Sequence, residues 1–295
     1  MGRDFRLRVG ALCAGPLLAM ALASPAAAQS LDSLRARFRL PPAPSRVAIA
    51  ANPARSAPGS SESSPSAFGA AFGDGFVGIS YQASQRHAAN VQDGAVFGGI
   101  GLGDPVNAVG LELTITSYST LRNEGGQGLG FNFMRIGGVS VMVHRRLPGN
   151  FAIAVGSENA LQWGNGGDGG SDVYGVVSTQ QQLAADPGGF LGSVTLNAGL
   201  GSGRFRPWIG DRYSGRPDTT GVGIFASGGL RLASSMSFIA DFSGQDLALG
   251  LSIAPFPNVP IVLNPVMADV LSRANPTARF VLGIGYGFRF SQFFR

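Results

Sequence analysis

The sequence predicts an all-β protein, a transmembrane antiparallel up-and-down β-barrel of about 12 strands, with 10 strands as the alternative count. Three observations predict this class. Apolar residues recur at every second position in many stretches after residue 70, which is the periodicity of strands. No stretch beyond the N-terminal region holds 18 uninterrupted apolar residues, so a helical span is not expected. Short and long links tend to alternate between the stretches, as they do in a barrel with turns at one end and loops at the other.

The first 28 residues read as a secretory signal peptide. A short basic start is followed by the apolar run VGALCAGPLLAMALA and then by SPAAAQS, whose small residues allow cleavage after Ala28. A retained membrane anchor is the alternative, but it would need about 20 apolar residues. Cys13 is the only cysteine and lies inside this run, so the mature chain is expected to have no disulfide.

Residues 29–69 are predicted to form a low-complexity periplasmic linker or tail. PPAPSRVAIAANPARSAPGSSESSPS is rich in Pro, Ser and Ala and shows no sustained period. Leu31, Leu34 and Phe38 in LDSLRARFRL could line one side of a short helix, but ten residues are marginal alone. The barrel is expected to occupy 70–295.

Twelve stretches are candidate strands. Nine show clear alternation, and those at 94–103, 172–180 and 259–264 are weaker. In order, the stretches are 76–82, 94–103, 108–117, 139–146, 151–158, 172–180, 190–200, 221–232, 236–242, 247–253, 259–264 and 279–290. The links DPVN, LPGN, ASS and PFPN have turn chemistry, and most of the intervening links are ten residues or longer. The links QQLAADPG and SGQ fit this alternation less well.

The two faces of the strands favour a membrane over water. In RFVLGIGYGFRF, one face carries Phe, Leu, Ile and Tyr, and the other carries mainly glycine with arginine at its ends. A soluble sandwich is the alternative, but its second face would usually carry many charges. Here that face is mostly Gly, Ser, Thr, Asn and Ala, which suits the inside of a closed barrel. Closure would also remove the open sheet edges that hydrocarbon forbids.

The chain resembles the Gram-negative outer-membrane β-barrels, over roughly residues 70–295. Its last strand is similar to their C-terminal assembly signal, with Gly285, Phe288 and Phe290 in the matching spacing, although the chain ends on Arg295 rather than an aromatic residue. The resemblance implies a bacterial outer-membrane location, the barrel-assembly machinery as a partner, and contact with outer-membrane lipids and lipopolysaccharide. It indicates no particular functional family.

Charge and composition exclude some partners. All 22 basic residues are arginine and only 13% of residues are charged, so the high pI reflects missing lysine rather than a nucleic-acid surface. No cofactor or metal site is expected. GGIGLG at 98–103 has no helix after it, so it is no dinucleotide loop. GNGGDGGSD at 164–172 is a single glycine repeat and therefore weak as a calcium site.

The first functional hypothesis is a narrow passive channel for small solutes, with charged residues of the inner face setting its selectivity. The candidate lumen-lining residues are Glu112, His144, Arg146, Glu158, Arg231, Asp241, Arg279 and Arg289. The alternative is a structural or adhesive envelope barrel with a blocked lumen and functional loops. Twelve strands fall between barrels filled by side chains and open porins, so both remain open.

Enzymatic activity is not expected, with an outer-membrane lipid hydrolase as a second alternative. Such a hydrolase would place a serine two residues after a histidine, but His144 is followed by Arg145 and Arg146. A surface-loop protease would need His87 to approach Asp168 and Asp172, which nothing in the sequence requires.

Two further features could bind something. Inward glycines on the first, second and last strands would form a smooth seam, either to permit curvature or to dock the 31–40 segment or a slender ligand. These are Gly78, Gly99, Gly101, Gly283, Gly285 and Gly287. Loop 201–220 could bind lipopolysaccharide phosphates or steer anions, or could be a plain solvated loop. Its candidate residues are Arg204, Arg206, Trp208, Arg212, Tyr213 and Arg216.

Overall fold

A computed structural model describes residues 58–85, 92–121, 130–164, 171–209, 216–217, 221–273 and 277–290. The predicted signal peptide and most of the predicted linker therefore lie outside the described residues. Side chains at 208, 209, 216 and 217 are also outside the description. Among the described residues, no helix has the length and apolar character needed to cross a membrane.

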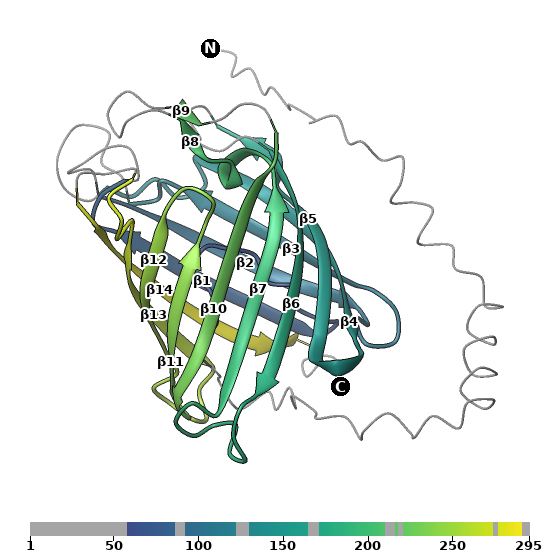
Figure 1. Ribbon diagram of the computed structural model, residues 1–295. Helices are drawn as coiled ribbons and strands as arrows, with labels where there is room; N and C mark the ends of the chain where they lie inside the picture. The colour runs from purple at the N-terminus through teal and green to yellow at the C-terminus, as the bar shows by residue number, and fades with distance from the viewer. Residues whose placement is uncertain are drawn as a thin grey trace, which may run out of the picture. The chain divides into compact units, whose positions relative to one another are not determined.

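Twelve antiparallel strands close into one barrel, which confirms the predicted closed antiparallel barrel and its strand count (Figure 1). They are β1 (Asp74–Gln82), β2 (Asp93–Gly103), β3 (Gly110–Tyr118), β4 (Ile136–Leu147), β5 (Phe151–Trp163), β6 (Asp172–Gln182), β7 (Ser193–Gly201), β10 (Gly223–Ala233), β11 (Met236–Phe242), β12 (Leu247–Ile253), β13 (Ile261–Ala268) and β14 (Arg279–Arg289). The short strands β8 (Trp208–Ile209) and β9 (Arg216–Pro217) pair separately, between β7 and β10. Each barrel strand pairs with its sequence neighbours, and β1 pairs with β14 to close the sheet.

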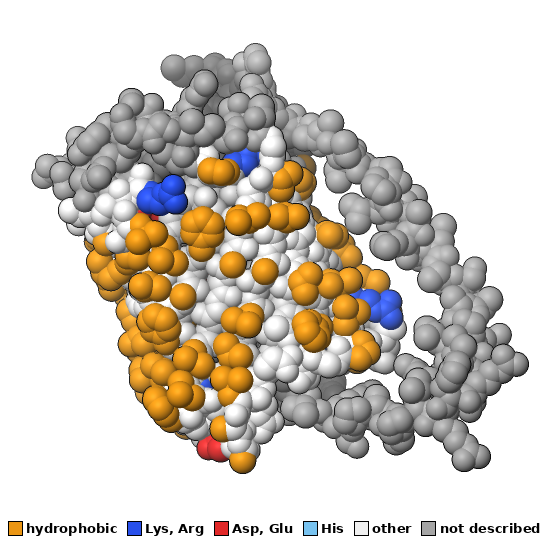
Figure 2. Space-filling model, in the orientation of Figure 1, with side chains coloured by type: hydrophobic (Ala, Val, Ile, Leu, Met, Phe, Trp, Pro, Cys, Tyr) orange, Lys and Arg blue, Asp and Glu red, His pale blue; other side chains and the backbone are white. Residues whose placement is uncertain are grey.

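The register places the two faces of the strands as their alternation predicts. Val77, Leu200 and Ile224 face outward and are 46%, 56% and 64% exposed, whereas Phe225 and Ile239 face inward and are 2% and 0% exposed. Figure 2 shows apolar side chains spread over the outside of the strands. Among the described residues, the outward side chains are thus apolar and exposed, as they are in proteins whose strands face hydrocarbon.

The tight turns and the longer connections gather at opposite ends of the barrel. The turns after β2, β4, β10 and β12 lie at one end, which we call the turn end, and β1 starts there. The connections after β1, β3, β5, β7 and β13 lie at the other end, which we call the loop end. Two links fitted the predicted alternation of short and long connections less well. QQLAADPG joins β6 to β7 at the turn end, and SGQ joins β11 to β12 at the loop end, as the strand order requires.

Residues 58–72 are the main departure from the expected fold. This segment, called the insert below, runs through the barrel interior and bonds to the inner faces of strands from β3 to β12. The predicted linker, residues 29–69, thus ends in a stretch that lies inside the barrel, and the first bond to the wall is made by Gly59. The physical reason is that short Gly, Ser and Ala side chains let the backbone approach the wall, where its amide groups find polar partners.

Candidate functional site: the occupied lumen

The insert is held most tightly at Asp241 on β11. One oxygen of this carboxylate, Oδ2, accepts backbone N–H groups from Glu62, Ser63 and Ser64 at 2.8, 2.8 and 2.9 Å. The hydroxyl of Ser64 donates to the other oxygen, Oδ1. Asp241 is 1% exposed, so water does not reach its carboxylate, and these donors take the place of the lost water. Hydrogen bonds to a charged acceptor are among the stronger ones in proteins, which makes Asp241 the main anchor of the insert.

Further along, the insert bonds to β6, β3 and β4. The Ala67 N–H donates to Ser178 Oγ at 2.8 Å, and the Ala70 N–H donates to Glu112 Oε2 at 2.8 Å. The Ala70 carbonyl lies 3.0 Å from His144 Nε2, which must donate to it. The backbone N–H and carbonyl of Ala70 are thus both hydrogen-bonded to inner-face side chains. These bonds fix the position of the insert just before β1 begins.

A short segment from the loop end reaches in to meet the insert. It is the 3-10 turn η2 (Gly203–Phe205), whose Arg204 Nη2 donates to the Ser63 carbonyl at 2.7 Å. The same guanidinium pairs with Glu158, Nη2 lying 2.6 Å from Oε1. Arg204 also lies over the Phe205 ring at 4.3 Å from its centre. One arginine therefore joins the loop end, the wall and the insert.

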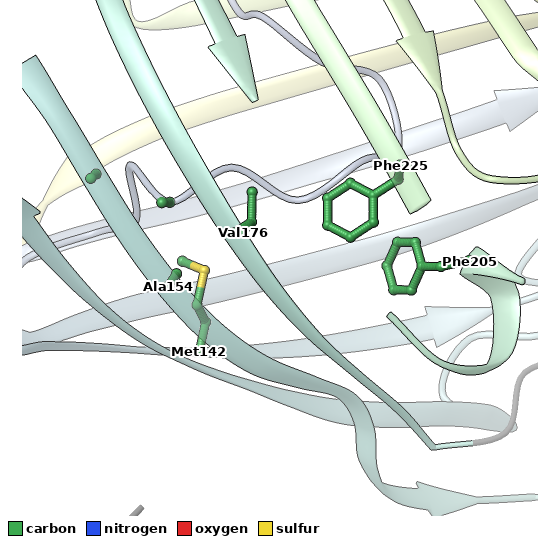
Figure 3. Close-up of a cluster of buried hydrophobic side chains, with 7 residues drawn as sticks. Met142, Ala154, Val176, Phe205 and Phe225 are labelled. Carbon is green, nitrogen blue, oxygen red and sulfur yellow. The ribbon is translucent and has the colours of Figure 1, made fainter. Parts of the chain in front are cut away.

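Apolar side chains fill the lumen beside these polar contacts. Ala67 of the insert and Phe205 of η2 are both 0% exposed and belong to one buried cluster with inner-face residues of β4, β5, β6 and β10. Its wall residues are Met142, Ala152, Ala154, Val176 and Phe225 (Figure 3). The Phe205 and Phe225 rings lie 4.5 Å apart between centres. In an open pore, side chains at these positions would contact water. In this barrel they pack against one another as a hydrophobic core.

The inner face on the other side, over β12, β13 and β14, is also buried in part. Ala248, Val266, Ala268 and Val281 form a second apolar cluster there. Beside it, Arg279 Nη2 pairs with Asp246 Oδ2 at 3.0 Å, with both side chains under 10% exposed. The interior is therefore packed around both halves of the wall.

The register puts all eight predicted lumen-lining residues on the inner face, but they do not line a shared open path. Asp241, Glu112 and His144 hold the insert, and Glu158 holds Arg204. Arg289 pairs with Asp74 at the turn end, 3.1 Å from Nε to Oδ1. Within the described part of the chain, the Nε atoms of Arg146 and Arg231 are buried without a hydrogen-bond partner.

The predicted glycine seam divides into two parts. Gly78 lies under the Phe97 ring and Gly99 under the Phe76 ring, so aromatic side chains of the neighbouring strand cover both. Gly101 faces the backbone of Ala70, which means that the insert, not the 31–40 segment proposed from the sequence, lies on it. Residues 31–40 fall outside the described residues.

On β14, the seam is open. A Cβ built on Gly283 would touch Asn264, whereas one built on Gly285 or Gly287 would meet no atom of the described residues within 4 Å. No described residue therefore covers the inner face of β14 toward the turn end.

Of the predicted loop residues, only the first two have described side chains. Arg204 turns into the lumen instead of toward solvent, and Arg206 Nε donates to the Gly221 carbonyl at 2.9 Å. The side chains of Trp208, Arg212, Tyr213 and Arg216 lie outside the description.

His144 bonds to the insert backbone. Its Nε2 is bonded to Ala70, and no hydroxyl of the described residues bonds to its Nδ1, which is buried without a partner. The described residues also contain no cluster of His, Cys, Asp or Glu that could hold a metal ion. The GGIGLG stretch lies within β2.

Sequence reasoning missed the insert and its partner η2. The available signal was the inner face itself, since Asp241, Ser178 and Glu112 on separate strands needed donors once they left water. Comparison with known proteins adds no functional assignment: no protein-family model matches the chain, and no curated protein matches its sequence.

Proposed function

We propose that this protein is a bacterial outer-membrane barrel that is closed in its resting state by its own insert, residues 58–72. The observation that carries the proposal is the bonding of the insert backbone by inner-face side chains, above all Asp241. A barrel built for free diffusion would leave such carboxylates in water. The apolar, unpartnered outer surface supports a hydrocarbon environment for the strands.

The test is conductance in planar bilayers. The full mature chain is expected to be silent, whereas a variant lacking 58–72, with the preceding chain joined to Gly73, is expected to show discrete openings. The matched control lacks 29–43 instead, a deletion of equal length that leaves the insert in place, and should stay silent. Steady openings of the full chain, equal to those of the insert deletion, would contradict the proposal.

A narrow passive channel is the second candidate, because no described residue covers Gly285 and Gly287 on the inner face. In that case the full chain would show small openings. Replacing Gly285 by Leu would reduce them, since the leucine side chain would project from the inner face into the lumen, and deletion of 29–43 would leave them unchanged.

A further inference from the structure

The wall of the lumen binds the insert mainly through its main chain. Six backbone N–H groups of the insert donate to inner-face side chains, those of Gly59, Glu62, Ser63, Ser64, Ala67 and Ala70. In the described part of the chain, the insert side chains that bond to the wall are those of Ser60 and Ser64. Because N–H groups are common to polypeptides, most of this recognition does not depend on the sequence of the insert.

Inner-face glycines let the insert backbone approach the wall this closely. A Cβ built on Gly101 of β2 would meet the backbone of Ala70, and one built on Gly229 of β10 would lie 2.8 Å from the carbonyl oxygen of Gly59. Glycine within a strand often marks a place where another backbone comes near. A side chain at either position would push the insert away from its hydrogen-bond acceptors. The glycines and the acceptors together form a track for a main chain, which we call the backbone track.

The backbone track leaves room for small side chains only. Ala67 is 0% exposed within the apolar cluster, and a Cβ built on Gly69 would touch Met142 and His144. Bulky residues at these places would force the wall side chains to move. The track therefore selects for a polypeptide rich in serine, glycine and alanine, as the insert is.

Both ends of the insert lie toward the turn end. Gly59 bonds to Ser252, one residue before the end of β12, and the Phe72 N–H donates to the carbonyl of Gly103, where β2 ends. The middle of the insert lies deeper, at Asp241 near the loop end of β11. The insert can thus withdraw toward the turn end without passing η2, which leaves the backbone track to another chain.

We propose that the backbone track binds polypeptide segments rich in serine, glycine and alanine, and that the insert is its resident occupant, which such a segment displaces. The proposal rests on the proposed closed lumen and names the class of ligand which that lumen takes. Successive N–H groups of the ligand replace those of the insert at the buried carboxylate of Asp241. A lipid chain brings no such donors and would leave this carboxylate without partners.

Thiol reactivity of the full mature chain tests the displacement. Ser64→Cys places a thiol of similar size at a position that is 4% exposed, and the mature chain is expected to have no other cysteine. A maleimide added to the protein in detergent reaches this thiol only when the insert leaves the wall. Ala67→Cys, at a position that is 0% exposed, is the second reporter if the first variant does not fold.

Two peptides are expected to speed the modification equally, one with the sequence of residues 58–72 and one with the same residues in shuffled order. At ten times its Kd, each should raise the rate about elevenfold, because the bound peptide keeps the insert out of the track. The matched control is the 58–72 peptide with N-methyl groups on its backbone amides. It keeps the side chains but has no N–H donors, so it should leave the rate unchanged.

The outcomes separate this proposal from the closed lumen. Slow modification that no peptide changes, acceleration by the 58–72 peptide alone, or acceleration by the N-methylated peptide would overturn the backbone track and leave the closed lumen standing. Phe190→Cys, at a position that is 73% exposed, gives the rate of a freely accessible thiol. Modification of Ser64→Cys at that rate without any peptide would instead show that the insert does not occupy the lumen, which contradicts the proposed function.

Discussion

Individual inner-face residues act here as ligands for backbone. Asp241, Ser178, Glu112 and His144 each bond to a main-chain group of the insert, so their polarity serves packing inside the barrel. Burying a carboxylate without such donors would lower the free energy of unfolding, and so would burying a backbone amide without an acceptor. The pairing explains why these polar residues are buried on the inner face.

Gly101 and Gly287 provide a matched test of the insert. A Cβ on Gly101 would lie 2.4 Å from the Ala70 backbone, whereas one on Gly287 would meet no atom of the described part of the chain within 4 Å. Gly101→Ala is expected to lower the free energy of unfolding by about 1–3 kcal/mol, because the insert must shift. Gly287→Ala should leave that free energy nearly unchanged. Urea unfolding followed by tryptophan fluorescence measures both, and equal effects would contradict the contact.

At the scale of elements, the insert, η2 and the wall form one packed unit. Ala67 and Phe205 come from opposite ends of the barrel and meet in the same apolar cluster. Arg204 adds a polar link between them by bonding to both Ser63 and Glu158. A displacement of η2 would therefore change the contacts of the insert.

The hold on the insert is expected to depend on pH through Glu62. Burial first, and the neighbouring Asp241 carboxylate second, raise the pKa of Glu62 to about 7. The folded state thus binds a proton more readily than the unfolded chain, so this group favours folding at low pH, and its contribution falls as pH rises from about 4.5 to 7. The change is at most about 3 kcal/mol.

Protease cleavage within the insert measures this dependence. The insert should be better protected at pH 5 than at pH 8, and Glu62→Gln should be equally protected at both. Equal cleavage of the unmodified chain at the two pH values would argue against the role of Glu62.

For the whole molecule, closure of the sheet and its apolar outer surface dominate behaviour. Closed barrels with no free edge keep their backbone hydrogen bonds internally and resist unfolding in detergent. We expect the processed protein to fractionate with outer membranes, and to migrate faster in detergent gels before heating than after it. Recovery as a monodisperse species in detergent-free buffer with its sheet intact would contradict the membrane assignment.

The strands were predictable one by one because each carries its own two-residue period. The stretches 236–242 and 247–253 coincide with β11 and β12, and the weak stretch 172–180 became β6 with two more residues. Boundaries shifted where a bulge interrupted the period, as in β5, which runs on to Trp163 past the irregularity opposite Val139. The turn residues also indicated which strands pair, because two strands joined by a short link must lie next to each other in the sheet.

By itself, the sequence determined the alternation and the chemistry of each face, since these depend only on neighbours along the chain, and it favoured twelve strands over ten. The tertiary structure decided what fills the lumen. Residues 58–72 have no period of their own, and their partners lie more than a hundred residues away at Ser178 and Asp241. Only closure of the barrel brings those side chains around one segment, and it is this closure that turns a polar inner face from a pore lining into a binding surface for the chain's own backbone.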